Sequence, residues 1–82
     1  MKIFYFAELK QLIGKEQDSI TITKKKTVSE VINDLKKRGQ NYDYAFSKIT
    51  NLKCAVNCEY VNFSNEVKND DELAFFPPVT GG

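Results

Sequence analysis

Two segments near the start of the chain and one near its end carry the hydrophobic patterns of β-strands. In "SITIT" (Ser19–Thr23) apolar and hydroxyl residues alternate strictly, so one face of the strand is apolar and the other polar. "KIFYFA" (Lys2–Ala7) and "ELAFF" (Glu72–Phe76) are rich in aromatic or β-branched residues, which favour strands. Because only a short helix fits between the first two segments, we expect their strands to be antiparallel neighbours.

The clearest helical pattern is a helix predicted over Thr27–Arg38. Four apolar residues repeat there at i, i+3, i+4 and i+7 and form one stripe, as in an amphipathic helix. Thr27 and Glu30 have the spacing of a capping box, in which each side chain accepts a hydrogen bond from the other residue's backbone N–H. Basic residues at 36–38 suit the negative end of the helix dipole, and Gly39 is expected to end the helix in the left-handed conformation.

A shorter helix is predicted on either side of this one. "ELKQLIG" (Glu8–Gly14) has three apolar residues at helical spacing before a terminal glycine, and it supports one or two turns. A weaker repeat over residues 42–49 predicts a second short helix, with Asn41 as its N-cap.

The rest of the pattern predicts two further strands and two turns. "KCAVN" (Lys53–Asn57) has the composition of a short strand, residues 57–59 form a turn, and a brief strand follows at Tyr60–Phe63. Polar residues 69–71 form the turn before the last strand. Two early strands, a crossover helix and a final strand that returns to the sheet give an α+β architecture. We therefore predict a β-grasp, or ubiquitin-like, fold with a mixed four- to five-stranded sheet packed on one main helix.

Composition places the chain among single-domain globular proteins. Its 82 residues suit one domain, and twelve basic against eleven acidic residues give a net charge of +1. A nucleic-acid-binding domain normally carries a strong basic excess on one face, so we expect no nucleic-acid partner. No apolar run approaches the ~20 residues needed to span a bilayer, and the N-terminal stretch is too short for a signal-peptide core. We expect a cytoplasmic protein with no membrane partner.

The cysteine and histidine content limits the chemistry that this chain can perform alone. The sequence has no histidine, which removes histidine-based acid–base catalysis and the Ser-His-Asp triad. Cys54 and Cys58 are too few for a zinc site, and a reducing compartment would keep them as thiols. We interpret Cys54 as a small buried hydrophobic residue; the alternative is a relay of persulfide sulfur through a cysteine.

Four segments carry a more specific pattern: "FYFAELKQLIG" (Phe4–Gly14), the helix at Thr27–Leu35, "AVNCEYV" (Ala55–Val61) and "DDELAFFPPVTGG" (Asp70–Gly82). Together they resemble the MoaD sulfur-carrier family, the small subunits of molybdopterin synthase. The resemblance covers essentially the whole chain, and the last segment is its most specific part. The chain departs from the family at Asp70, where glycine is frequent, and at Cys58, where a larger polar residue is frequent.

The resemblance implies a carrier whose C-terminal carboxylate takes up sulfur. An ATP-using activating enzyme would adenylate the carboxylate of Gly82, which would then be converted to a thiocarboxylate. The sulfur would pass to cyclic pyranopterin monophosphate in the large catalytic subunit, within a heterotetramer of two small and two large subunits. This chain would then be a non-catalytic subunit that binds no cofactor tightly and no metal.

The last six residues, 77–82, are predicted to form a flexible tail on a β-grasp domain of residues 1–76. Pro77 and Pro78 cannot donate a backbone hydrogen bond, so the last strand should end at Phe76. Both prolines favour an extended polyproline conformation, which would hold the tail away from the domain. A tail that is already extended loses less entropy when a partner binds it.

The tip of the tail has the residue types that a narrow channel requires. Gly81 and Gly82 lack a Cβ, so they are slim and can adopt backbone conformations closed to other residues. Val79 and Thr80 would add backbone hydrogen bonds and side-chain contacts along such a channel.

A domain of this size cannot bury all of its aromatic residues, so some should lie on the open face of the sheet. By resemblance we place Phe6, Tyr60 and Phe76 there, in contact with both the activating enzyme and the large subunit; the alternative for each is a place in the core. Pro77 to Thr80 would extend this contact along the tail. Near the root of the tail we also predict a cluster of acidic residues that would attract a basic active site, or else form a solvated turn: Glu66, Asp70, Asp71 and Glu72.

The sequence is also compatible with two other functions. One is a sulfur carrier for another pathway, of the thiamine type, whose members also end in Gly-Gly. The other is a ubiquitin-like binding module in which the tail has no sulfur chemistry. Removal of Gly81 and Gly82 should abolish the function of a carrier and leave that of a binding module intact.

Overall fold

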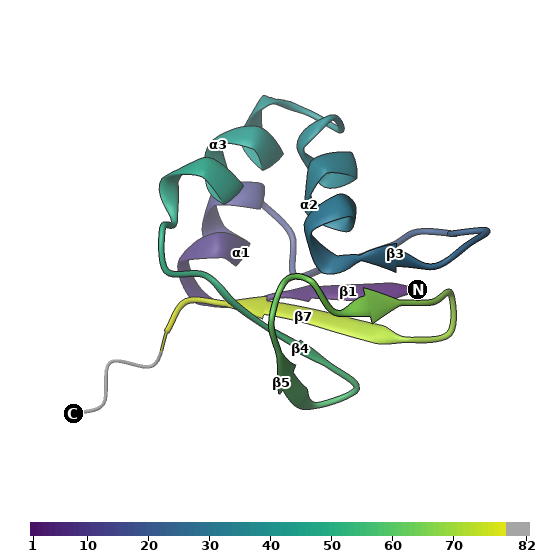
Figure 1. Cartoon of the computed structure of the whole chain (residues 1–82). Coiled ribbons are helices and arrows are strands. Elements are labelled where there is room, and N and C mark those ends of the chain that lie inside the picture. The colour runs from purple at the N-terminus through teal and green to yellow at the C-terminus, as the bar shows by residue number, and fades with distance from the viewer. Residues whose placement is uncertain (79–82) are drawn as a thin grey trace.

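A mixed five-stranded sheet carries three helices on one of its faces (Figure 1). The computed structural model describes residues 1–78. The strands of the sheet lie in the order β2-β1-β7-β4-β5. Their bounds are β1 Lys2–Tyr5, β2 Gln17–Ser19, β4 Lys53–Val56, β5 Glu59–Val61 and β7 Glu72–Phe76. The helices are α1 Ala7–Ile13, α2 Val28–Lys36 and α3 Gln40–Lys48. The architecture is the predicted α+β, β-grasp arrangement, with three helices over the sheet where one was expected to dominate.

The two central strands come from opposite ends of the chain. β1 pairs with β7 in parallel, with Ile3 opposite Leu73 and Tyr5 opposite Phe75, and the other pairs of this sheet are antiparallel. These four side chains are almost completely buried. β2 is antiparallel to β1, as the sequence predicts.

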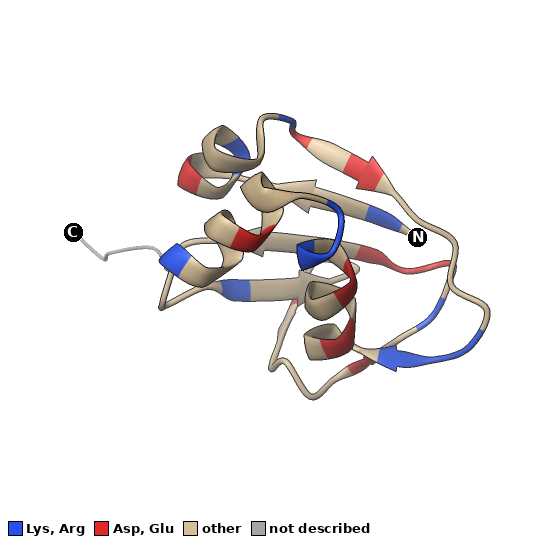
Figure 2. Cartoon of the chain, turned by 90° about the horizontal axis from the view of Figure 1, so that it is seen from above, with Lys and Arg blue, Asp and Glu red and all other residues tan. Residues whose placement is uncertain are grey.

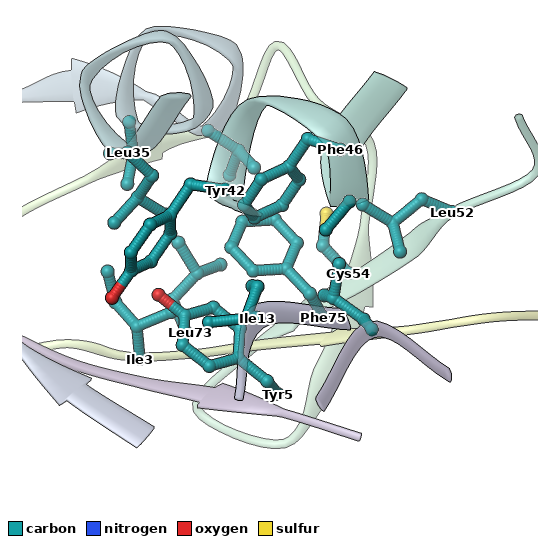
Figure 3. Packing of buried hydrophobic residues seen from close by; sticks show 14 of the residues in the cluster. Ile3, Tyr5, Ile13, Leu35, Tyr42, Phe46, Leu52, Cys54, Leu73 and Phe75 are labelled. Atoms are coloured by element: carbon teal, nitrogen blue, oxygen red, sulfur yellow. The ribbon is translucent and has the colours of Figure 1, made fainter. Parts of the chain in front are cut away.

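The core lies between the sheet and the helices (Figure 3). The ring of Phe46, from α3, stands edge-on to that of Phe75, with centroids 5.3 Å apart at 82°. It also meets the ring of Tyr5 at 6.4 Å and 73°. Edge-to-face pairs of this kind add about 0.5–1.5 kcal/mol beyond the burial of their surface. The apolar stripe of α2 completes the core with Val28, Val31 and Leu35.

The start of α2 agrees with the sequence and its end does not. Both halves of the capping box are present: the Glu30 N–H donates to Thr27 Oγ1 (3.2 Å) and the Thr27 N–H to Glu30 Oε1 (2.8 Å). The helix ends at Lys36, and Gly39 has an extended backbone (φ 170°), so the predicted left-handed stop is wrong. Gly39 is instead the N-cap of α3. The Gly39 carbonyl accepts a hydrogen bond from the Asp43 N–H (3.1 Å), which closes the first turn of that helix.

The prediction that Asn41 is the N-cap of the second short helix is also wrong. Asn41 lies inside the first turn of α3, and its Nδ2 donates to the carbonyl of Ile13 at 2.7 Å. That bond satisfies one of the carbonyl groups left without a partner at the end of α1.

The predicted strand at residues 19–23 is shifted towards the N-terminus. β2 ends at Ser19 because its partner in β1, Lys2, is the first residue of that strand. Ile20 still bonds to Met1, through Ile20 N–H to the Met1 carbonyl (2.9 Å). The small second sheet, β3 (Lys26–Thr27) with β6 (Glu66–Val67), was not predicted, because two residues are too few to show a period.

A tight turn joins β4 to β5. Asn57 and Cys58 both have positive φ, 50° and 70°, between the paired residues Val56 and Glu59, as in a type I′ hairpin turn. β4 begins at Lys53 as predicted and ends one residue early, while β5 covers 59–61 in place of 60–63. Glycine is the preferred residue at the second turn position, so Cys58 holds a conformation that costs a non-glycine residue free energy.

We therefore expect Cys58→Gly to raise the free energy of unfolding by about 0.5–1 kcal/mol, since relief of the left-handed strain outweighs the added freedom of the unfolded chain. Urea denaturation measures the change. The matched control is Cys58→Ser, which removes the thiol and keeps the backbone strain. An equal gain in both variants would show that the thiol, and not the backbone, is responsible.

A carboxylate with little exposure connects β2 to the rest of the domain. Asp18 accepts hydrogen bonds at one oxygen from the hydroxyl groups of Tyr5 (2.9 Å) and Tyr42 (2.7 Å). Its other oxygen lies 3.3 Å from both Lys15 Nζ and Arg38 Nη1, and its side chain is only 9% exposed. Burial raises the pKa of Asp18, but the hydrogen bonds from Tyr42, Tyr5 and Lys15 lower it more, so the pKa is below its usual value. These side chains thus tie β2 to β1, to α3 and to Arg38 in the segment that joins α2 to α3.

Asp18→Asn should destabilise the domain by about 2–3 kcal/mol near pH 7, because several charge-assisted bonds are lost. The pKa of Asp18 is lower in the folded chain, so its contribution is present above the unfolded value of about 3.9 and is lost as pH falls through the folded value. Denaturation of both proteins at neutral pH and at about pH 2.5 should show the difference shrinking in acid. A difference that stays constant with pH would contradict this account of the carboxylate.

Candidate functional site

The root of the tail lies at one end of the central strand. β7 ends at Phe76, as predicted, and it is followed by Pro77 and Pro78, which are both half-buried. Neither proline has an N–H for the ladder, which explains why the strand ends there. The N–H of Phe6 donates to the carbonyl of Phe75 (3.2 Å), so the end of β1 lies beside the tail root. In Figure 1, β7 runs from the end of the molecule marked N to the opposite end.

The face of the sheet away from the helices carries exposed aromatic side chains. Alternation along β7 places Leu73 and Phe75 in the core and Ala74 and Phe76 on the open face. Tyr60, on the edge strand β5, is 79% exposed. The centroid of its ring lies 5.3 Å from the centroid of the Phe76 ring. Phe6 is 50% exposed at the end of β1. We call Phe6, Tyr60 and Phe76 the aromatic surface.

Next to the aromatic surface lies a groove of about 870 Å³. It follows the edge of the sheet between the start of β4 and the chain that leaves β5. Its lining is mainly apolar. The lining residues include Lys53, Tyr60, Val61, Phe63, Phe76 and Pro78. We call this the edge groove. The sequence could not reveal it, because it depends on where β5 stops relative to β4.

The structure brings together five of the predicted site residues. Phe6, Tyr60, Phe76, Pro77 and Pro78 lie around the tail root, and the alternative that the three aromatic residues are core is wrong for Phe6 and Tyr60. Phe76 is only half-buried. The other predicted site residues lie outside the described residues: Val79, Thr80, Gly81 and Gly82.

The predicted acidic cluster is not near the tail root. Glu72 begins β7 and the tail follows its last residue, so a five-residue strand separates them. Asp71 has a structural role: its oxygens accept from Lys68 N–H (2.9 Å) and from Asn57 Nδ2 (3.0 Å). The bond from the Lys68 backbone is the main cause that lowers the pKa of Asp71. These residues are close to the tail in the sequence, but the five extended residues of β7 span roughly 17 Å.

The cysteines do not form a site with the tail root. Cys54 is buried, as predicted, and its thiol donates to the carbonyl of Val61 (3.4 Å). Burial raises the pKa of the Cys54 thiol, which disfavours the reactive thiolate. Cys58 is exposed, but it lies in the turn at the other end of β4 from Lys53. Within residues 1–78, no group of three or more His, Cys, Asp or Glu side chains is arranged to hold a metal ion.

In the view of Figure 2, Lys and Arg alternate with Asp and Glu over the described elements. The salt bridges join neighbouring elements, as where Lys48 Nζ of α3 lies 3.4 Å from Glu8 Oε2 of α1. None of the helices in residues 1–78 is long and apolar enough to cross a membrane. The site that remains is an exposed aromatic surface at the root of a tail.

Comparison with known proteins identifies the class of protein that this fold and site define. Residues 3–82 match the model of the ThiS family, and the chain belongs to that family. Together with the three relatives described next, this match confirms the resemblance to MoaD-type sulfur carriers.

Three relatives carry the name molybdopterin synthase sulfur carrier subunit. The one from Haemophilus influenzae is 35% identical over 83 residues, covering 100% of this chain and 99% of the relative. The one from Dictyostelium discoideum is 37% identical over 83 residues, covering 99% and 94%. The one from Escherichia coli is 30% identical over 82 residues, covering 100% and 99%.

Solved structures confirm the β-grasp fold. SAMP1 from Haloferax volcanii superposes with a TM-score of 0.80 at 23% identity, covering 100% of this chain and 98% of that one. At that identity the likeness shows the fold alone. A putative molybdopterin converting factor, subunit 1, from Pyrococcus furiosus gives a TM-score of 0.76 at 30% identity, covering 95% of each chain.

The aromatic surface should be dispensable for folding. Tyr60→Ala should change the free energy of unfolding by less than about 1 kcal/mol, because the side chain is already in water. Phe75→Ala, two residues from the tail root but in the core, should cost about 3–5 kcal/mol. Chemical denaturation of the two variants checks this contrast, and a large loss in Tyr60→Ala would show that the residue belongs to the core.

Proposed function

We propose that this chain is the sulfur-carrier small subunit of molybdopterin synthase and that the carboxylate of Gly82 carries the sulfur. The observation that supports this most strongly is the position of the tail root. The central strand of the sheet leads directly into Pro77 and Pro78, beside an aromatic surface that the fold leaves exposed. The names of the three relatives and the family match, which runs through residue 82, point the same way.

The chemistry begins with activation of a poor electrophile. The carboxylate oxygen of Gly82 attacks the α-phosphorus of ATP on an activating enzyme, and pyrophosphate leaves. A sulfur nucleophile then displaces AMP from the acyl adenylate and leaves a thiocarboxylate. In this scheme the activating enzyme binds the nucleotide and supplies the acid–base groups. The contribution of this chain is to present the reacting carbon atom to each partner in turn.

The geometry of the tail limits where the partner's active site can lie. Pro78 is the last described residue, and four residues follow it. Four extended residues span at most about 14 Å, so a partner must hold its catalytic groups within that distance of Pro78. The absence of Cβ atoms at Gly81 and Gly82 suits a narrow channel at that depth.

We propose two partners that use the same end of the molecule. One is the activating enzyme, and the other is the large catalytic subunit, in which cyclic pyranopterin monophosphate receives the sulfur. The aromatic surface would contact both, so the two complexes would exclude each other. We expect two small and two large subunits in the synthase, and a cytoplasmic location, where thiols and thiocarboxylates stay reduced.

Two alternatives make different predictions. A thiamine-type carrier would also load sulfur at Gly82 but would not deliver it to the large synthase subunit. A ubiquitin-like binding module would need the aromatic surface and not the terminal glycines. The three relatives, all named for molybdopterin synthase, favour the first proposal.

The test compares the full chain with one that ends at Thr80, using the large subunit and the activating enzyme from the same organism. The thiocarboxylated full chain should convert cyclic pyranopterin monophosphate to molybdopterin. The shortened chain should show no conversion above background, because its terminal carboxylate, on Thr80, lies two residues, or up to about 7 Å, short of the position of Gly82. Product is measured by chromatography of its fluorescent oxidised form.

Tyr60→Ala in the full chain is the matched control. It keeps the reactive carboxylate and loses part of the docking surface, so added protein should restore its rate. Equal conversion by the full and the shortened chain would contradict the proposal. If neither chain bound the large subunit, the molybdopterin assignment would fail in favour of another sulfur pathway.

A further inference from the structure

The edge groove is open because the last pair of strands is unequal in length. β5 ends at Val61, which pairs with Cys54, so Lys53 at the start of β4 has no β5 residue opposite it. After Val61 the chain turns towards α2, where Ser29 N–H donates to the carbonyl of Phe63 (3.0 Å). The groove lies between this departing chain and the start of β4.

One charged side chain, that of Lys53, stands in the lining of the edge groove. The other lining residues are apolar or neutral polar. Lys53 is exposed and forms no ion pair with any residue from 1 to 78. Its antiparallel partner in β7 is Phe76, which belongs to the aromatic surface. An ammonium group therefore stands beside an apolar groove, and the described fold gives it no counter-charge.

The groove is continuous with the tail root, because Pro78 forms part of its wall. A protein that takes up the tail must therefore come against the groove as well. A stable contact of ordinary size buries about 800 Å² on each partner, and a buried aromatic side chain accounts for about 150–250 Å². The three partly exposed aromatic residues supply only part of that area. Tyr60 and Phe76 also line the edge groove, and the rest of its apolar lining, which includes Val61, Phe63 and Pro78, can supply more.

We propose that the edge groove receives an apolar side chain of the large synthase subunit, and that a carboxylate beside that side chain pairs with Lys53. The inference rests on the proposed function and adds the chemistry of the partner's segment. We choose the large subunit over the activating enzyme for two reasons. The relatives of this chain are named as subunits of the synthase. A stable contact between subunits also needs a larger buried area than a transient complex with an enzyme. The apolar side chain would lie against Val61 and Phe63, with its neighbouring Asp or Glu at the rim.

The test measures binding to the purified large subunit by isothermal titration at low ionic strength. Lys53→Glu should raise Kd roughly tenfold, because an attraction becomes a repulsion. Lys53→Arg keeps the charge and should stay within about threefold of the unchanged chain. The loss in Lys53→Glu should shrink as salt is raised from about 0.05 to 0.5 M, since exposed charges are screened.

Lys24→Glu is the matched control. It makes the same change of charge in the exposed loop that leads to β3, at a residue that does not line the edge groove, and should leave Kd within about twofold. Thermal unfolding of each variant excludes a folding defect, which none should show because both lysines are exposed. The titrations are repeated in a chain that ends at Thr80.

Each result decides between distinct cases. If the unchanged chain binds and Lys53→Glu binds equally well, the proposed pairing is wrong while the proposed function stands. If Lys53→Glu weakens binding only when Gly82 is present, Lys53 acts on the chain's own carboxylate and the proposal is overturned. If the unchanged chain does not bind, the proposed function fails and this inference fails with it.

Discussion

The parallel pairing of β1 with β7 joins the two ends of the chain in the middle of the sheet, and the other features of the molecule depend on it. Ile3, Tyr5, Leu73 and Phe75 form the floor of the core on which all three helices pack. A shift of one residue in β7 would turn Leu73 and Phe75 out of the core and Phe76 into it, because side chains alternate along a strand. The same pairing sets the point at which the chain leaves the domain. The core and the tail root are therefore positioned by one register.

The aromatic residues have two roles, which depend on whether they lie on the core face or the open face of the sheet. Phe46 and Phe75 pack edge-on in the core and contribute to stability. Tyr60 and Phe76, at the same end of the sheet, lie in contact with each other on the open face. A small domain gains stability by burying such side chains, so exposing them has a cost that a partner's surface would recover. Tyr60 and Phe76 stand where the central strand ends, so the function proposed above places docking and chemistry at the same end of the sheet.

Local signals in the sequence predicted the parts of the fold that depend on neighbouring residues. The capping box of Thr27 and Glu30 and the end of β7 before the prolines were correct, because each is decided within a few positions. The left-handed conformation predicted for Gly39 was wrong because the start of α3, a separate element, decides the conformation of this residue. The acidic cluster was misplaced because its closeness to the tail in the sequence takes no account of the length of the extended strand β7 between them. Lys53 was missed because its position opposite Phe76 depends on register between strands far apart in the sequence. The aromatic surface was predicted only through the family resemblance, since composition cannot tell which aromatic residues are left outside.

The most direct test of the central claim is the intact mass of the chain after incubation with ATP, a sulfur donor and the activating enzyme from the same organism. The account predicts a gain equal to the replacement of one oxygen by one sulfur, dependent on ATP and located by fragmentation at Gly82. Alkylation of the product should label that terminus. The account would be contradicted if the enzyme consumed ATP on this chain and the mass did not change, or if the added sulfur lay on Cys58.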